Sequence, residues 1–154
     1  MEREGHLEWK VKYAPGKLEA FGKRNGRKLY AKVETTTAPY QIVLTPDRTA
    51  INADGKDVCV MNVTVTDNKG REVATAMNNI NFTVEGNAKI IGVGNGNPSS
   101  HEPDKFFDNN WQRKLFNGKC QVIIQATDAA GEFKFTAIAD ALQPAMVAIK
   151  TTAN

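Results

Sequence analysis

The sequence predicts an all-β protein built as a sandwich or a barrel. Short runs in which apolar and polar residues alternate recur about every ten residues, with turn-forming residues between them. No run of about eleven residues shows the 3.6-residue period of an amphipathic helix. Strands with one buried face, joined by turns, explain these observations.

The second part of the chain contains the clearest strands, and each is expected to bury one side. Turns are expected between them at Asp67–Gly70, Glu85–Asn87 and Asp128–Gly131, where Asp, Asn and Gly gather. The expected inward residues are Cys59, Met61, Val63 and Val65; Ile80, Phe82 and Val84; Cys120, Val122, Ile124 and Ala126; Phe133, Phe135 and Ala137; and Ala145, Val147 and Ile149.

The first 37 residues differ, and three short strands are expected there, at residues 7–13, 17–23 and 27–35. Pro15-Gly16 is expected to form the first turn. Asn25-Gly26 is expected to form the second, because a type I′ turn needs positive φ at both central residues. We place a boundary near Ala38, with one segment at 1–37 and a domain at 39–154. Three strands bury too little surface to be stable alone, so we expect the chain to be part of a longer protein.

Composition narrows the class of protein. Of 154 residues, 41% are hydrophobic and 24% are charged, as in a soluble globular domain. A net charge of +3 does not indicate nucleic-acid binding, and no apolar run reaches the length of a membrane span. The N-terminus is polar, unlike a signal peptide. The basic stretch Gly22–Lys28 is expected to be a solvated turn, because it holds four charges and no aromatic residue.

Cysteine and aromatic side chains leave some alternatives open. Cys59 and Cys120 are expected to be either two buried thiols or a cross-sheet disulfide. With two histidines and no ligand spacing, a structural zinc site is not expected. Trp9 and Tyr13 are expected to be core or interface residues rather than a sugar platform.

The stretch "GVGNGNPSSHEPDKF" (Gly92–Phe106) is the least ordinary part of the sequence. It lacks the glycine spacing and following helix of a dinucleotide site, and its acidic and amide groups match no EF-hand spacing. His101 beside Glu102 has no nucleophile nearby. Two structural interpretations remain: the long loop caps the end of the domain, or it docks on a neighbouring domain. The aromatic residues that need burial under either interpretation are Phe106, Phe107, Trp111 and Phe116.

Several stretches resemble parts of bacterial glycoside hydrolase family 2 enzymes, in particular the β-galactosidase-like ones of gut Bacteroides. "WKVKYAPGKLEA" (Trp9–Ala20) resembles the end of the small β-domain that follows their catalytic barrel. "LTPDRTAINADGKD" (Leu44–Asp57) resembles the start of the next, immunoglobulin-like domain. Later motifs of that domain resemble "GVGNGNPSSHEP" (Gly92–Pro103) and "FNGKCQVIIQA" (Phe116–Ala126). The commoner family form has Asp at the position of Asn97, which argues against a cation in this loop.

The resemblance implies a fold and a function. Residues 39–154 would be an immunoglobulin-like β-sandwich of about seven strands, and residues 1–37 a three-stranded remnant of the preceding domain. The longer enzyme would hydrolyse terminal β-galactosides with retention, using two glutamates of a barrel that this chain lacks. The chain itself would be a non-catalytic accessory part without cofactor or metal. Immunoglobulin precedent would place a disulfide near Cys59 and Cys120.

The implied partners are the other domains of the enzyme and, as a second candidate, carbohydrate; nucleic acid and membrane are not expected. The enzyme would be periplasmic, cell-surface or secreted. The residues expected at a domain interface or substrate rim are Asn95, Asn97, His101, Glu102 and Trp111. Two alternatives stay open: a carbohydrate-binding module, and an adhesin-type immunoglobulin-like module.

Overall fold

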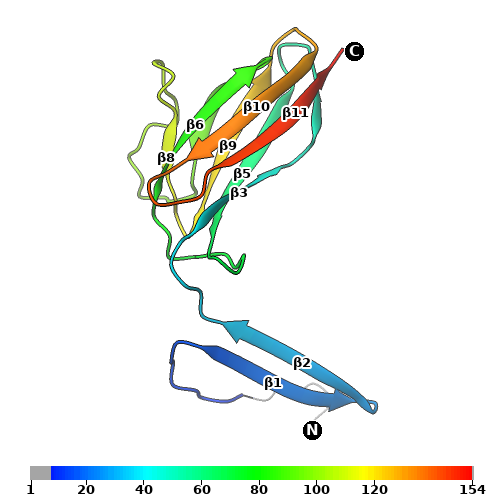
Figure 1. The fold of residues 1–154 in the computed structure, drawn as a ribbon, viewed down its shortest axis with the longest axis vertical. Coiled ribbons are helices and arrows are strands. Elements are labelled where there is room, and N and C mark those ends of the chain that lie inside the picture. Colours follow the sequence, from blue (N-terminus) through cyan, green and yellow to red (C-terminus); the bar gives the residue numbers. More distant parts are fainter. Residues whose placement is uncertain (1–7, 154) are drawn as a thin grey trace. The chain divides into compact units, whose positions relative to one another are not determined.

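The computed structural model describes residues 8–153, which form eleven strands and no helix (Figure 1). The strands make sheets of two, five and four strands. The prediction of an all-β protein is therefore confirmed. Since the described residues contain no helix, none of them belongs to a helix long and apolar enough to cross a membrane. The chain divides into two compact units that meet between Thr35 and Thr36.

The first unit is a hairpin of β1 (Lys17–Arg24) and β2 (Arg27–Glu34), paired antiparallel. Asn25 and Gly26 join the strands with φ of 49° and 77°, which confirms the predicted tight turn. A strand was also expected at residues 7–13. This prediction is wrong for residues 8–13, which pair with neither β1 nor β2; Leu7 lies outside the described residues. Pairing of the two strands extends one step beyond their ends, with Thr35 N donating to Gly16 O at 2.8 Å.

The two faces of this hairpin differ in chemistry. Every second cross-strand pair lies on the same face. One face is apolar along most of its length and carries the pairs Leu18–Val33, Ala20–Ala31 and Gly22–Leu29, with Arg24–Arg27 at its turn end. The other face carries Lys17–Glu34, Glu19–Lys32, Phe21–Tyr30 and Lys23–Lys28. Nothing in the described chain covers the apolar face, and the larger apolar residues of the hairpin are more than half exposed. Trp9 and Tyr13, expected in a core or interface, are 69% and 77% exposed.

The second unit contains nine strands in two sheets. The four-stranded sheet has the order β3-β5-β9-β7, and the five-stranded sheet has the order β4-β11-β10-β6-β8. Neighbouring strands are antiparallel except for β4 and β11. The bounds are β3 (Gln41–Pro46), β4 (Ala50–Asn52), β5 (Val58–Thr66), β6 (Asn79–Gly86), β7 (Ala88–Gly94), β8 (Gln112–Lys114), β9 (Lys119–Ala126), β10 (Gly131–Ile138) and β11 (Ala145–Thr152).

About seven strands were expected in this unit, and the structure has two more. The additional strands are β4 and β8, each three residues long and each at an edge of the five-stranded sheet. A three-residue strand is too short for an alternating pattern to be recognised in the sequence. β8 nevertheless matters for the candidate site, because it carries the side chain around which the long loop is built.

One hydrophobic core contains residues of both sheets, and the predicted inward residues form most of it. All those of β5, β9 and β10 are buried, as are Ile80, Phe82 and Ile149. Val84, Ala145 and Val147 are partly buried against the same core. Phe82 of β6 stacks on Phe135 of β10 with ring centroids 5.6 Å apart. Burying a side chain of this size contributes about 1.5–3 kcal/mol, so the alternation in the sequence accounts for the main source of stability.

The two cysteines are separate buried thiols, so the disulfide alternative is wrong. Both lie on the inward face of neighbouring strands, but Cys59 is opposite Ile124 and Cys120 is opposite Val63. That register offsets the cysteines by four residues, or about 13 Å along the strands, whereas a disulfide needs Cα atoms within about 7 Å. Burial raises the pKa of Cys59 to about 11 and that of Cys120 to about 12. Both thiols therefore stay protonated and unreactive near neutral pH.

Candidate functional site

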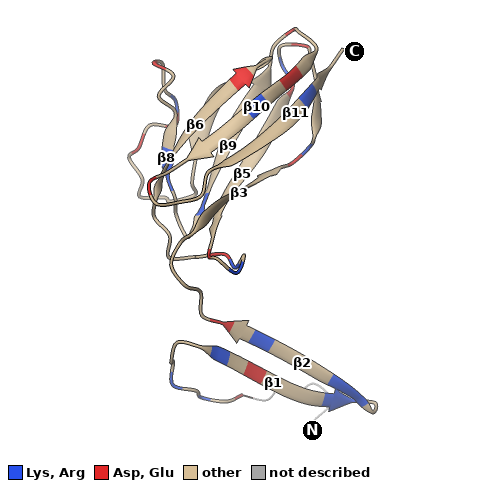
Figure 2. Cartoon of the chain, viewed as in Figure 1, with Lys and Arg blue, Asp and Glu red and all other residues tan. Residues whose placement is uncertain are grey.

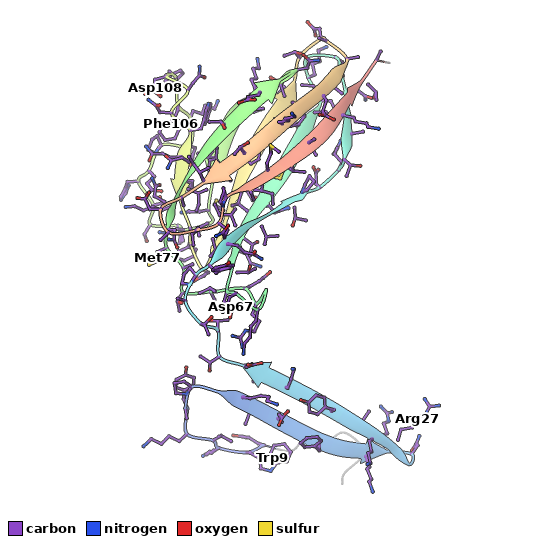
Figure 3. All side chains as sticks on the ribbon, viewed as in Figure 1. Trp9, Arg27, Asp67, Met77, Phe106 and Asp108 are labelled. Carbon is purple, nitrogen blue, oxygen red and sulfur yellow. The ribbon has the colours of Figure 1, made fainter. Side chains whose placement is uncertain are left out.

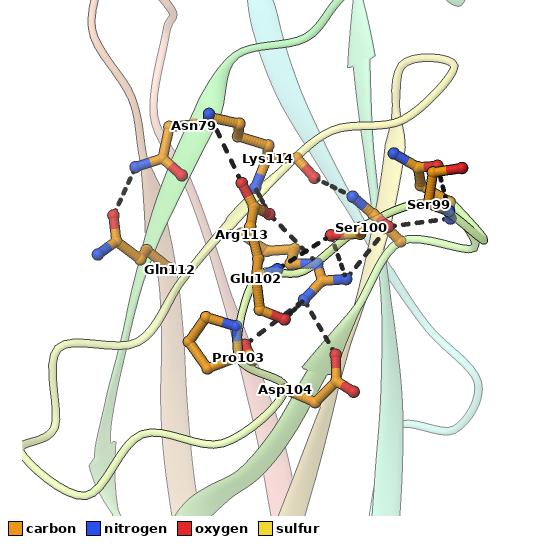
Figure 4. A network of polar contacts seen from close by, with 11 residues as sticks. Asn79, Ser99, Ser100, Glu102, Pro103, Asp104, Gln112, Arg113 and Lys114 are labelled. Atoms are coloured by element: carbon orange, nitrogen blue, oxygen red, sulfur yellow. Dashed lines mark hydrogen bonds and ion pairs between the residues drawn. The ribbon is translucent and has the colours of Figure 1, made fainter.

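The candidate site is the long loop between β7 and β8 (Figure 4). β7 is an edge strand of the four-stranded sheet and β8 an edge strand of the five-stranded sheet, so the loop carries the chain from one sheet to the other. Val93 N donates to Asp104 O at 2.9 Å and fastens the middle of the loop to β7. Loops of this length are uncommon in compact domains and are often functional.

Arg113 of β8 is the residue around which this loop is organised. Its side chain is 5% exposed. Nη1 donates to Asp104 Oδ1 at 2.9 Å and to the carbonyl oxygens of Glu102 and Pro103 at 3.1 and 3.4 Å. Nη2 donates to Asn95 Oδ1 at 3.2 Å and to Ser100 Oγ at 3.3 Å. A buried guanidinium with this many acceptors fixes the loop, because each contact satisfies part of a charge that has left water.

The predicted asparagines close local turns beneath this arginine. Asn95 Nδ2 donates to Lys114 O at 2.9 Å, and Asn95 Oδ1 also accepts from Asn97 N at 3.0 Å. Asn97 Oδ1 accepts from Ser99 N at 3.0 Å. These are the side-chain to backbone turns that Asn favours. In the structure, Asn95 and Asn97 therefore shape the loop.

Glu102 is held from two sides, whereas His101 is exposed. Glu102 Oε2 accepts from Lys114 N at 3.3 Å and lies 3.6 Å from Arg113 Nε. Its Oε1 lies 3.7 Å from Lys114 Nζ. Glu102 therefore joins the loop to β8 through contacts with both Arg113 and Lys114.

The loop aromatics divide into three that pack and one that does not. Trp111 is 8% exposed, and its ring meets Phe106 edge-on with centroids 5.7 Å apart. Phe116 is half-buried, whereas Phe107 is 99% exposed. Figure 3 labels Phe106 and Asp108 in this part of the loop. Packing by Trp111 and Phe106 supports the capping interpretation for one side of the loop and leaves Phe107 at the surface.

The loop ends in a turn that orders its exposed tip. Asp108 Oδ1 accepts from Asn110 N at 3.2 Å, and Asp108 Oδ2 accepts from Asn110 Nδ2 at 2.9 Å. These bonds to Asn110 hold the pKa of Asp108 below its usual value. Between them, Asn109 takes φ of 61°. The hydrogen bonds between Asp108 and Asn110 therefore order the backbone that follows the exposed Phe107.

An open groove lies beside the loop and the outer face of β7 and β9. Its lining includes Ile91, Asn95, Asp104, Gln121 and Ile123. Both acidic side chains on the loop side of this groove, Glu102 and Asp104, are paired with Arg113. Within residues 8–153, no three His, Cys, Asp or Glu side chains are placed to hold a metal ion.

The structure thus brings Asn95, Asn97 and Glu102 together around Arg113, and places Trp111 in the core. Sequence reasoning did not single out Arg113. The pattern that could have revealed it is the alternation of Trp111, Arg113 and Leu115, all buried, with exposed or half-buried residues between them. An arginine at an inward position of such a run predicts a buried charge with acceptors around it.

Comparison with protein families gives two matches along the chain. Residues 42–148 match the model "Glycoside hydrolase family 2 C-terminal domain 5". Residues 1–30 match a separate model, a domain of unknown function called DUF4982. The chain therefore carries sequence from two family models, one on each side of the junction between its two units.

Known proteins similar to this chain are much longer than it is. Beta-galactosidase BoGH2A of Bacteroides ovatus is 44% identical over 146 residues, which are 94% of this chain and 17% of that protein. A solved glycosyl hydrolase family 2 member from Bacteroides cellulosilyticus is 33% identical with a TM-score of 0.82, covering 95% of this chain and 18% of that one. A β-glycosidase from Bacteroides vulgatus is 28% identical with a TM-score of 0.81, over 94% and 18% of the two chains.

Proposed function

Since the chain belongs to the glycoside hydrolase family 2 C-terminal domain 5 family, we propose that it is a non-catalytic accessory part of a longer β-galactosidase. This longer protein, called the parent enzyme below, hydrolyses terminal β-galactosides with retention. The observation that carries the proposal is the 44% identity along 94% of the chain to 17% of a β-galactosidase. An accessory region of a similar enzyme would match in this way, with high identity to a small part of the relative.

The chemistry of the loop supports an accessory role. Retaining glycosidases use two carboxyl groups about 5–5.5 Å apart, one of them free to attack and one able to donate a proton. In the candidate site, Glu102 and Asp104 are both bound to the buried Arg113 instead. Both carboxylates take part in the contacts that shape the loop, so catalysis is assigned to another domain of the parent enzyme.

Residues 39–154 are proposed to be an immunoglobulin-like sandwich that serves as a rigid support. The support for this is a four-stranded and a five-stranded sheet, mostly antiparallel, that share one hydrophobic core. Sandwiches of this kind present loops at the ends of their sheets. The loop between β7 and β8 would be one of these.

The β1–β2 hairpin is proposed to be the end of the preceding small β-domain. Its apolar face, with the pairs Leu18–Val33, Ala20–Ala31 and Gly22–Leu29, is uncovered within the described residues. A two-stranded hairpin is at best marginally stable in water and needs further strands or another surface against this face. The separate family match of residues 1–30 agrees with a domain distinct from the one that follows.

The loop tip at Phe107 is proposed to contact a neighbouring domain of the parent enzyme. A phenylalanine that is 99% exposed buries no apolar surface in this chain, while Phe106 and Trp111 beneath it are packed. Aromatic side chains presented on an ordered support are common anchors of interfaces. If the contact lies near the catalytic centre, Asn95, Asn97 and His101 would lie in a loop that shapes its rim.

Replacing Phe107 with alanine in the parent enzyme tests this contact. We expect the Tm of the parent enzyme to fall, or its KM to rise about two- to tenfold, because an interface anchor is lost. The Tm of the isolated chain should stay unchanged, since Phe107 packs on nothing there. Trp111→Ala would be less informative, because the core position of Trp111 predicts unfolding of the domain itself.

Met146→Ala is the matched control for this test, because Met146 is an exposed apolar residue on β11. It should leave both the Tm and the KM of the parent enzyme unchanged. If Phe107→Ala left both the Tm and the KM of the parent enzyme unchanged, the contact would be refuted.

The parent enzyme is further proposed to be periplasmic, cell-surface or secreted, on the basis of the family resemblance; fractionation of the source cells checks this.

A further inference from the structure

The positive charge of this chain is concentrated in its first unit. Between residues 8 and 35 the sequence has eight basic and three acidic side chains, whereas residues 36–154 have eleven basic and twelve acidic side chains. Figure 2 shows the Lys and Arg positions gathered where β1 and β2 meet. No acidic residue occurs from Ala20 to Val33. The end of the hairpin is therefore the most strongly charged part of the described chain.

Pairing of the strands places these charges opposite one another. Lys23 is directly opposite Lys28, and Arg24 is directly opposite Arg27. Like charges at directly opposed positions destabilise a hairpin. A bound anion would remove this repulsion, so the arrangement costs stability in the free chain and favours a negatively charged ligand.

An aromatic pair lies next to the opposed lysines on the same face. A solvated turn was expected here because no aromatic residue lies within Gly22–Lys28, but the fold brings Phe21 and Tyr30 to the neighbouring cross-strand pair. Their ring centroids are 5.1 Å apart, and the side chains are 78% and 53% exposed. A shallow concavity beside them is lined by Phe21, Gly22, Lys23, Lys28 and Leu29.

The tyrosine of this pair is held in place by two charged neighbours. Tyr30 Oη donates to Glu19 Oε1, and Lys17 Nζ donates to the same oxygen at 2.9 Å. The ring of Tyr30 is therefore fixed before any ligand arrives, which lowers the entropic cost of binding. Phe21 leans on it at an interplanar angle of 40°.

We propose that this face of the hairpin binds an anionic oligosaccharide, a sugar chain that carries carboxylate or sulfate groups. Lys23 and Lys28 would pair with the acid groups, while Arg24 and Arg27, which belong to the other face, add positive charge at the adjoining turn. Phe21 and Tyr30 would contact the apolar C–H face of a neighbouring sugar ring. The choice of a sugar rests on the proposed function, in which the parent enzyme is a glycosidase. The opposite face is the one assigned there to the preceding domain, and within this chain Phe21 and Tyr30 on the charged face are exposed.

Calorimetric titration of the 154-residue chain at low salt tests this proposal. The probes are a sulfated heparin tetrasaccharide, a tetramer of galacturonic acid and a neutral galactan tetramer. We expect saturable binding of at least one of the two charged probes and none of the neutral one. Affinity should fall as salt rises, because ion pairing releases counterions. Amide chemical shifts should change in β1 and β2.

Variants identify the groups responsible. Lys23→Gln with Lys28→Gln should weaken binding by about tenfold or more, and Phe21→Ala by about fivefold. Lys134→Gln with Lys150→Gln, on the exposed face of β10 and β11, is the matched control and should leave affinity unchanged. Unchanged amide spectra of the hairpin in each variant show that it still folds.

Three results would overturn the proposal. One is binding of neither charged probe, and another is equal binding of the neutral probe. The third is equal binding of oligothymidylate together with no effect of Phe21→Ala, which would mean an unspecific polyanion surface. The experiment involves neither catalysis nor the rest of the parent enzyme, so its failure would leave the proposed function standing.

Discussion

Replacing Arg113 with leucine is expected to lower the free energy of unfolding of this chain by about 1–3 kcal/mol. The leucine would fit a buried strand position, but it cannot donate. Ser100 Oγ and the carbonyl oxygens of Glu102 and Pro103 would lose the donor Arg113, and the carboxylate of Asp104 would lose its partner. Asn95 Oδ1 would keep only the bond from Asn97 N. Part-buried acceptors of the loop would be left without this donor, which accounts for the expected loss, whereas the Asp104 side chain is 76% exposed and stays hydrated.

Urea unfolding of the wild-type chain and of Arg113→Leu measures the difference in their free energies of unfolding. Arg113→Lys should fall between wild type and Arg113→Leu, because lysine keeps the charge and loses the planar fork of donors. Lys119→Gln is the control: it removes an exposed ion pair with Glu72, 2.8 Å long, and should change stability by less than about 1 kcal/mol. If Arg113→Leu were as stable as wild type, the loop would not depend on this residue.

Asp67→Asn is expected to lower the Tm by roughly 10 °C. Asp67 is fully buried after β5 and accepts hydrogen bonds from the backbone N of Thr37, Lys69 and Arg71 at 3.0, 2.9 and 3.0 Å. Arg71 also donates from Nε and Nη2 at 2.8 and 2.6 Å. An amide in place of the carboxylate carries no charge and turns one acceptor into a donor that faces other donors. Differential scanning calorimetry near pH 7 measures the shift.

The effect of Asp67→Asn should also depend on pH. Hydrogen bonds from Arg71, followed by those from the backbone, hold the pKa of Asp67 far below its usual range. A carboxyl whose folded pKa is depressed stabilises the fold fully above its unfolded pKa of about 3.9, and this contribution is lost as pH falls further. The difference between wild type and Asp67→Asn should therefore be constant from pH 7 to about pH 5 and shrink toward pH 2. A difference that does not vary with pH would contradict this account of Asp67.

Alternation in the sequence was enough to predict which side of each long strand is buried. Cys59, Met61, Val63 and Val65 are all buried, because a period of two leaves one choice of face. Asn25-Gly26 predicted the hairpin turn for an equally local reason, the positive φ of both residues. Where a local rule determines the structure, the sequence alone was sufficient.

Features that depend on distant parts of the chain were missed or left open. Residues 8–13 alternate like a strand, but pairing requires a neighbouring backbone that alternation does not supply. The disulfide alternative failed because strand register, which cannot be read from the spacing of two cysteines, offsets Cys59 from Cys120. At the candidate site, Asn95 and Glu102 were predicted from composition, but Arg113, which joins them, lies beyond the loop on a three-residue strand. Their role at a domain interface stays a prediction.

Hydrolysis of an aryl β-galactoside, measured for the isolated 154-residue chain and for the parent enzyme side by side, tests the central claim most directly. The account predicts no turnover by the chain above the buffer rate. It also predicts hydrolysis by the parent enzyme with the anomeric configuration retained, which NMR of the first product detects. Turnover by the isolated chain, or a parent enzyme that hydrolyses no β-galactoside, would contradict it.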